Sequence, residues 1–191
     1  MADTIAAYSW LMDKAGRGEI DGAKVCLAGR SLGGAVAIAA TAQLLRDTAD
    51  SERGSRGAGG SDVGGASTPR PSLRAPCALI LENTFTSISS MVDTKFPFLN
   101  VPFFKELFMR LKWDSIGTIP SIALPILFLS SARDEIVPRE QMVALHAAAA
   151  AASPRQFHSF AGAMHNDIWV KGGMDYWRAK QSFMNEFCER R

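Results

Sequence analysis

Short apolar runs alternate along the chain with longer segments whose apolar residues recur at helical spacing. Three of these runs, at 24–29, 77–81 and 125–129, are apolar on both faces, which is typical of strands buried in a parallel sheet. A fourth run at 155–160 is less apolar, so we expect it to form an edge strand. The pattern therefore predicts about four parallel strands.

Helical periodicity predicts four helices, at 2–15, 32–45, 138–152 and 173–189. The first and last are amphipathic, and we expect their apolar stripes to face the core. The stripe of the first helix contains Ile5, Tyr8, Trp10, Leu11 and Met12, and that of the last contains Tyr176, Trp177, Phe183, Met184 and Phe187. Strands that alternate with helices favour right-handed βαβ units, so the predicted fold class is α/β.

The length of 191 residues fits a single domain, 1–191, and two segments depart from the alternation. Residues 50–74 contain six glycines and five serines with few bulky apolar residues, which predicts a flexible low-complexity insertion. Residues 84–118 are irregular and rich in aromatic residues. The pattern on both sides of 50–74 belongs to one α/β series, so we interpret that segment as a surface insertion.

Composition and charge exclude several classes of protein. Hydrophobic residues make up 47% of the chain and charged residues 21%, which excludes global disorder. The formal net charge of +2 is too small and too scattered for nucleic acid to be the main partner. We find no signal-peptide pattern and no run of about 18 apolar residues that would span a membrane.

The cysteines indicate a reducing environment. Cys26, Cys77 and Cys188 are odd in number and far apart, so we expect buried free thiols and no disulfide framework. The sequence contains no CxxC motif and no Cys/His cluster, so we expect no metal and no other cofactor.

One pentapeptide carries a chemical signal. Gly29-Arg30-Ser31-Leu32-Gly33 matches Gly-x-Ser-x-Gly and lies between a predicted strand and an Ala-rich helix, as a nucleophile elbow requires. In such a turn the serine has a positive φ, which lifts its Oγ above the sheet, and Gly29 and Gly33 leave the space that the turn needs. We expect Gly34 to let the helix approach the strand closely. The N–H of Leu32 at the helix start would face a developing oxyanion. A Gly-Ser turn without any chemical role is the alternative interpretation.

A serine nucleophile needs a general base and an orienting acid. His146 falls within a predicted helix and His158 within a predicted strand, whereas His165 follows a strand on a loop, where catalytic groups gather. Asp134 also follows a strand. We therefore predict Ser31 as nucleophile, Asp134 as acid and His165 as base.

Each of these assignments has a competitor. Glu82, Glu135 and Asp167 could replace Asp134, although Asp167 is better placed to cap the last helix or to hold its loop. His165 could equally be a loop histidine that only forms local hydrogen bonds.

At these residues the chain resembles the α/β-hydrolase superfamily, and most of all the α/β hydrolase domain-containing protein 13 group of serine hydrolases. The resembling segments are 29–38, 81–87, 134–138 and 165–167. The order Ser31, Asp134, His165 is the order found in α/β-hydrolases. The resemblance implies the same three catalytic roles and a cap-like segment at 84–118.

The resemblance also implies a partial α/β-hydrolase fold, because the chain supplies candidates only for the last four strands of the superfamily's sheet. We expect a truncated chain without the His-Gly loop that provides a second oxyanion N–H, and losing one such donor costs about 10²–10³ in kcat. Members of the group carry an N-terminal membrane segment, so we expect membrane association only through sequence that this chain lacks. The expected location is cytoplasmic or membrane-associated, facing a reducing compartment.

The expected activity is carboxylesterase-like hydrolysis of an ester or thioester through an acyl-enzyme, with a small-molecule or lipid-like acyl substrate. Phenylalanines in the cap-like segment favour an apolar acyl group, or else simply cover the core: Phe96, Phe98, Phe103, Phe104 and Phe108. A catalytically impaired remnant that acts as an interaction module is one alternative. A serine peptidase of the prolyl-oligopeptidase type is another, ranked lower because the sequence shows no acidic cluster for a peptide amine.

Overall fold

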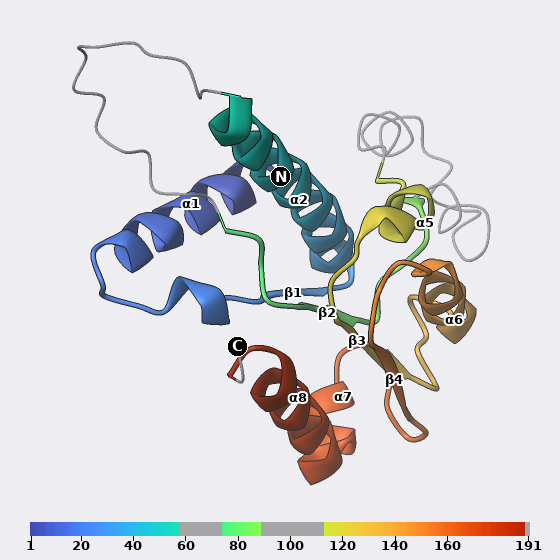
Figure 1. The fold of residues 1–191 in the computed structure, drawn as a ribbon. Helices are drawn as coiled ribbons and strands as arrows, with labels where there is room; N and C mark the ends of the chain where they lie inside the picture. The colour runs from blue at the N-terminus through green and yellow to red at the C-terminus, as the bar shows by residue number, and fades with distance from the viewer. Residues whose placement is uncertain (58–73, 89–112, 190–191) are drawn as a thin grey trace, which may run out of the picture.

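A four-stranded parallel sheet forms the centre of the structure, a computed structural model that describes residues 1–57, 74–88 and 113–189 (Figure 1). The strands lie in the order β1-β2-β3-β4, and each pairs in parallel with the next. Their bounds are β1 Leu27–Arg30, β2 Leu79–Glu82, β3 Ile126–Ser131 and β4 Arg155–Phe160. The predicted α/β class, the four parallel strands and the edge position of the last strand are confirmed.

Helices cover both faces of this sheet (Figure 1). One face packs against α2, α5, η3 and α6, and the other packs against α7 and α8. Helix α1 packs on α2, and η1 leads into β1. The bounds are α1 Ala2–Gly16, η1 Gly22–Lys24, α2 Leu32–Gly57, α5 Ser115–Thr118, η3 Ile119–Ser121, α6 Arg139–Ala148, α7 Ile168–Lys171 and α8 Gly173–Phe187.

The strand pattern explains why the core has two halves. Leu79 and Leu81 of β2 pack with Ile38 of α2 and with α6, whereas Ile80 between them packs with Phe183 of α8. Successive side chains of a strand point to opposite faces, so a run that is apolar at every position must be covered on both sides. The continuous apolar runs of the sequence therefore required two layers of helices.

Helix α2 is longer than predicted and reaches Gly57. It occupies the first part of the segment 50–74, so the expectation that the whole segment is flexible is wrong for residues 50–57. A helix whose first turns are packed extends readily, because each further residue adds one hydrogen bond without a new nucleation step. Residues 58–73 of the predicted insertion, and 89–112 of the cap-like segment with its five phenylalanines, lie outside the described residues.

The amphipathic helices bury narrower stripes than the sequence predicted. Tyr8 in α1 and Tyr176 in α8 are buried, but Trp10 is 56% exposed and Trp177 is 53% exposed. Met184 is also exposed. Each helix touches its neighbours along one side only, so the apolar residues at the margins of the stripe remain in solvent. No described helix combines the length and the apolar character needed to cross a membrane.

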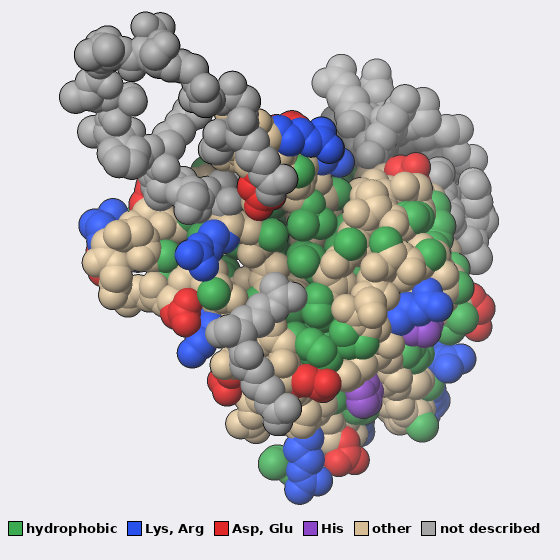
Figure 2. Space-filling model, in the orientation of Figure 1, with side chains coloured by type: hydrophobic (Ala, Val, Ile, Leu, Met, Phe, Trp, Pro, Cys, Tyr) green, Lys and Arg blue, Asp and Glu red, His purple; other side chains and the backbone are tan. Residues whose placement is uncertain are grey.

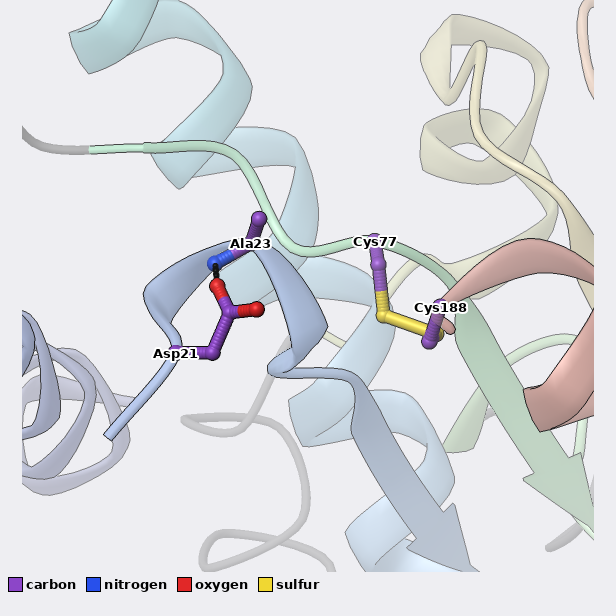
Figure 3. The surroundings of a disulfide bond; sticks show 4 residues. All are labelled: Asp21, Ala23, Cys77 and Cys188. Atoms are coloured by element: carbon purple, nitrogen blue, oxygen red, sulfur yellow. Dashed lines mark hydrogen bonds between the residues drawn. A yellow bond between two sulfur atoms is a disulfide. The ribbon is translucent and has the colours of Figure 1, made fainter. Parts of the chain in front are cut away.

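Cys77 and Cys188 form a disulfide, so the expectation of three free thiols is wrong (Figure 3). Cys77 precedes β2 and Cys188 follows α8, and 111 residues separate them. Helix α8 runs back along the sheet and ends beside the start of β2, a proximity that the spacing of the cysteines could not reveal. Cys26 remains a free thiol, and burial raises its pKa.

Candidate active site

Ser31 occupies a tight turn between the end of β1 and the start of α2. Its φ is 52°, within the left-handed region that residues other than glycine rarely adopt. The Ser31 N–H donates to the Glu82 carbonyl at 2.9 Å, and the Thr84 hydroxyl donates to the Ser31 carbonyl at 2.7 Å. The backbone of Ser31 is therefore held on both sides by the end of β2 and the residues after it.

The glycines of the motif have different roles. A Cβ on Gly29 would lie 2.2 Å from the Gly33 carbonyl oxygen, so no larger residue fits there. A Cβ on Gly33 would meet nothing within 4 Å, because this residue faces solvent at the start of α2, so the expectation that Gly33 must lack a side chain is wrong. Gly34 is the second position with a steric requirement, since a Cβ there would lie 2.5 Å from the Thr84 side chain.

The imidazole of His165 and the carboxylate of Asp134 form a buried pair. His165 Nδ1 lies 2.8 Å from Asp134 Oδ2 and 3.0 Å from Oδ1, and the two side chains are 5% and 2% exposed. Asp134 Oδ1 also accepts the backbone N–H groups of Ile136 and Val137 at 2.9 and 2.7 Å. The carboxylate is thus fixed in orientation, and Nε2 is the ring nitrogen left for another partner.

Several side chains hold the loop that carries His165, among them Glu135, Asn83 and Asp167. Glu135 Oε2 accepts the His165 backbone N–H at 3.0 Å, and Asn83 Nδ2 donates to the His165 carbonyl at 3.2 Å. Asp167 Oδ1 accepts the Met164 N–H at 2.6 Å. The competing carboxylates Glu135 and Asp167 therefore contact the backbone of the loop, while Asp134 contacts the imidazole.

Glu82 and His146 have other partners, and His146 is half-buried. Glu82, the last residue of β2, is buried and accepts a hydrogen bond from the Tyr176 hydroxyl at 2.7 Å. His146 packs against the rings of Phe128 and Phe157, with centroid separations of 5.2 and 5.4 Å. In the described part of the chain, no cluster of three or more His, Cys, Asp or Glu side chains is arranged to hold a metal ion.

The sequence reasoning missed Asn83 as a residue that shapes the site. Its φ is 44° and it is 1% exposed. Its side chain accepts the Ser131 N–H at 2.8 Å, and its Nδ2 donates to the Ser131 hydroxyl and to the His165 carbonyl. The signal was available, because asparagine tolerates the left-handed region and here follows a buried strand beside the Ser31 turn.

The strand order brings these residues to one edge of the sheet. Ser31, Asn83, Asp134 and His165 follow β1, β2, β3 and β4 in turn, and parallel strands place their carboxyl ends together. Direct contact is seen between Asp134 and His165. Ser31 joins the same edge through its backbone contacts with β2.

Comparison with known proteins finds a curated relative that is an alpha/beta hydrolase domain-containing protein. No family model matches it. It is 35% identical over 183 residues to the alpha/beta hydrolase domain-containing protein WAV2 of Arabidopsis thaliana, covering 91% of this chain and 50% of that protein. It is 37% identical over 167 residues to protein bem46 of Schizosaccharomyces pombe, covering 85% of this chain and 44% of that protein. The chain thus spans about half the length of the curated relatives it matches.

Solved structures show the same fold. A puromycin-hydrolyzing peptidase of Mycobacterium tuberculosis matches with a TM-score of 0.64 and 20% identity, over 97% of this chain and 25% of that chain. A truncated carbohydrate esterase from gut microbiota matches with a TM-score of 0.65 and 17% identity, over 98% of this chain and 68% of that chain. At such identities the likeness concerns the fold alone. The parallel sheet and the comparisons agree: the chain has the α/β-hydrolase fold and is related to an alpha/beta hydrolase domain-containing protein.

Proposed function

We propose that the protein is a serine hydrolase that cleaves an ester or thioester through Ser31, His165 and Asp134. The observation that carries the proposal is the buried pair of His165 and Asp134 on the sheet edge to which the Ser31 turn belongs. The carboxylate beside Nδ1 is itself oriented by two backbone N–H groups, as an acid that holds a catalytic imidazole requires. The resemblance of the surrounding segments supports the same roles.

The reaction has two halves. Ser31 Oγ attacks the acyl carbonyl carbon while His165 Nε2 takes the hydroxyl proton, and Asp134 stabilises the imidazolium that forms. The bond to the alcohol or thiol then breaks, and the leaving group takes the proton from Nε2. In the second half, water gives a proton to Nε2 and attacks the acyl-enzyme, which releases the acid and returns the proton to Ser31.

The developing negative charge needs a donor beside Ser31. Leu32 is the first residue of α2, and the first N–H groups of a helix have no partner within it. Its N–H is therefore a donor that this chain offers to the oxyanion, and the helix dipole adds to its effect. Since one donor is worth about 10²–10³ in kcat, we expect slow turnover if no second donor acts.

A fluorophosphonate probe tests the nucleophile. We expect it to label wild type and to spare Ser31→Ala, while the matched control Ser121→Ala on η3 is labelled like wild type. Asp134→Asn should keep the fold but lower the labelling rate by about 10⁴, because the carboxylate no longer fixes the imidazole tautomer. Labelling of Ser31→Ala at the wild-type rate would contradict the assignment. Comparing a nitrophenyl ester with an aminoacyl anilide then separates an esterase from a peptidase.

A second candidate function rests on the open strand β1. It lies at one end of the described sheet, and its residues are only partly buried, with Ala28 and Arg30 exposed. Apolar side chains gather at the centre of the face seen in Figure 2, between α1 and α2 above and α8 below. An exposed edge can pair with another strand, which would make the chain an interaction module. Protection of β1 from hydrogen exchange in a monomer with esterase turnover would contradict this candidate.

A further inference from the structure

We propose that Arg30 is a positioning residue that ties the Ser31 turn to the His165 loop, an inference that rests on the proposed function. Arg30 is the last residue of β1 and directly precedes Ser31. Its Nη1 donates to Asn166 Oδ1 at 3.0 Å, and Asn166 directly follows His165. One hydrogen bond thus joins the neighbour of the nucleophile to the neighbour of the base across 136 residues of chain.

A second contact fixes the direction of the Arg30 side chain. Its Cζ lies 5.2 Å from the ring centroid of Trp169, which belongs to α7. Trp169 and Asn166 both follow His165, so the guanidinium touches the His165 segment at two points. A planar guanidinium can stack on an aromatic ring and donate in its plane at the same time, whereas a lysine ammonium cannot do both.

The two halves of the site need such a tie because different strands hold them. Ser31 is anchored to the end of β2 through Glu82 and Thr84. The imidazole of His165 is anchored to Asp134, which follows β3. Asn83 connects the two regions from the buried side through its hydrogen bond to the His165 carbonyl. Arg30 connects them from the exposed side. Together the hydrogen bonds of Asn83 and Arg30 limit how far His165 Nε2 can move from the Ser31 hydroxyl.

The cost of losing the tie should appear in the chemical step. A displacement of reacting groups by about 1 Å can lower a rate by about 10²-fold, and a partial displacement costs less. Because Arg30 is exposed, its replacement should leave the fold intact. We therefore expect Arg30→Met, which keeps the aliphatic stem, to lower kcat about tenfold with little change in KM.

The experiment is a double-mutant cycle on the wild-type chain. Arg30→Met, Asn166→Ala and the double variant are compared in their fluorophosphonate labelling rate and in kcat and KM for a nitrophenyl ester. Since Asn166 acts through its hydrogen bond with Arg30, which Arg30→Met already removes, the double variant should be no slower than the slower single variant. Arg30→Lys should not restore the rate, and Arg178→Met, an exposed arginine on α8, should match wild type.

The outcomes separate this inference from the proposed function. Wild type labelled at Ser31, with Arg30→Met and Asn166→Ala at the wild-type rate, overturns the role of Arg30 alone. Rate losses that simply multiply in the double variant also overturn it, because the two residues would then act independently. Labelling that does not depend on Ser31 overturns the proposed function and the positioning role together.

Discussion

The left-handed conformation of Ser31 predicts that removing its Cβ will stabilise the protein, while the loss of the hydroxyl abolishes the reaction proposed for it. At a φ of 52° the Cβ of an L residue is crowded by the backbone, at a cost of about 1–2 kcal/mol. Glycine avoids this cost but loses more conformational freedom on folding, which lowers the free energy of unfolding by about 0.5–1 kcal/mol. Ser31→Gly should therefore have a free energy of unfolding about 0.5–1 kcal/mol higher than Ser31→Ala.

Comparing these two variants isolates the backbone effect, because both lack the hydroxyl and they differ only in the Cβ. Urea unfolding with the disulfide intact, followed by far-UV circular dichroism, measures the difference. For a chain of this size, 1 kcal/mol corresponds to about 2–4 °C in Tm. We expect neither variant to react with the fluorophosphonate probe.

Ser121 in η3 provides a control with the opposite expected sign. Its φ is not positive, so Ser121→Gly should be less stable than Ser121→Ala. A Ser31→Gly protein that is no more stable than Ser31→Ala would refute the reasoning. It would mean that the positive φ of Ser31 does not lower the free energy of unfolding.

The structure supports three further predictions. Gly29→Ala should unfold or fail to accumulate because its Cβ would lie 2.2 Å from the Gly33 carbonyl oxygen, whereas Gly33→Ala should fold and be labelled at Ser31; equal behaviour would contradict the steric argument. Cys188→Ser should lower the free energy of unfolding by about 2–5 kcal/mol, as expected for opening a long loop, and urea midpoints unchanged by reductant would speak against it. Burial, with Arg155 nearby, lowers the pKa of His146, so the folded protein favours the neutral imidazole. The contribution of His146 to the free energy of unfolding is therefore complete above the pKa that it has in the unfolded chain, and it is lost as the pH falls through the pKa that it has in the folded protein. NMR titration of the ring would check this, and an ordinary pKa for His146 would exclude it.

Much of the architecture was readable from local pattern. The run 77–81 is apolar at every position, which only a strand covered on both faces can tolerate, and the structure buries it between two helical layers. Pro138 and the amphipathic segment after it predicted α6, although the helix ends at Ala148, before the end expected for it. The predicted end of α2 was too early, because composition indicates the flexibility of an isolated segment and not how far a packed helix extends.

The candidate site was predictable in its residue types but not in its supports. Gly29-Arg30-Ser31-Leu32-Gly33 between a strand and a helix pointed to the turn, and a histidine on a loop after a strand pointed to His165. The hydrogen bonds that Asn83 and Arg30 make to the His165 loop join residues far apart in the chain. No periodicity or motif carries such pairings, because they depend on which loops the strand order brings together.

The sequence by itself determined the α/β class, the strand count and the order of the serine, carboxylate and imidazole, since each depends on residues close in the chain or on their succession. Only the tertiary structure decided that Asp134, and not Glu82, Glu135 or Asp167, contacts the imidazole of His165. It also decided that Cys77 meets Cys188 and that Gly33, unlike Gly29 and Gly34, has room for a side chain. The reason is physical: contact between distant residues is fixed by how layers pack, and packing is a property of the whole chain.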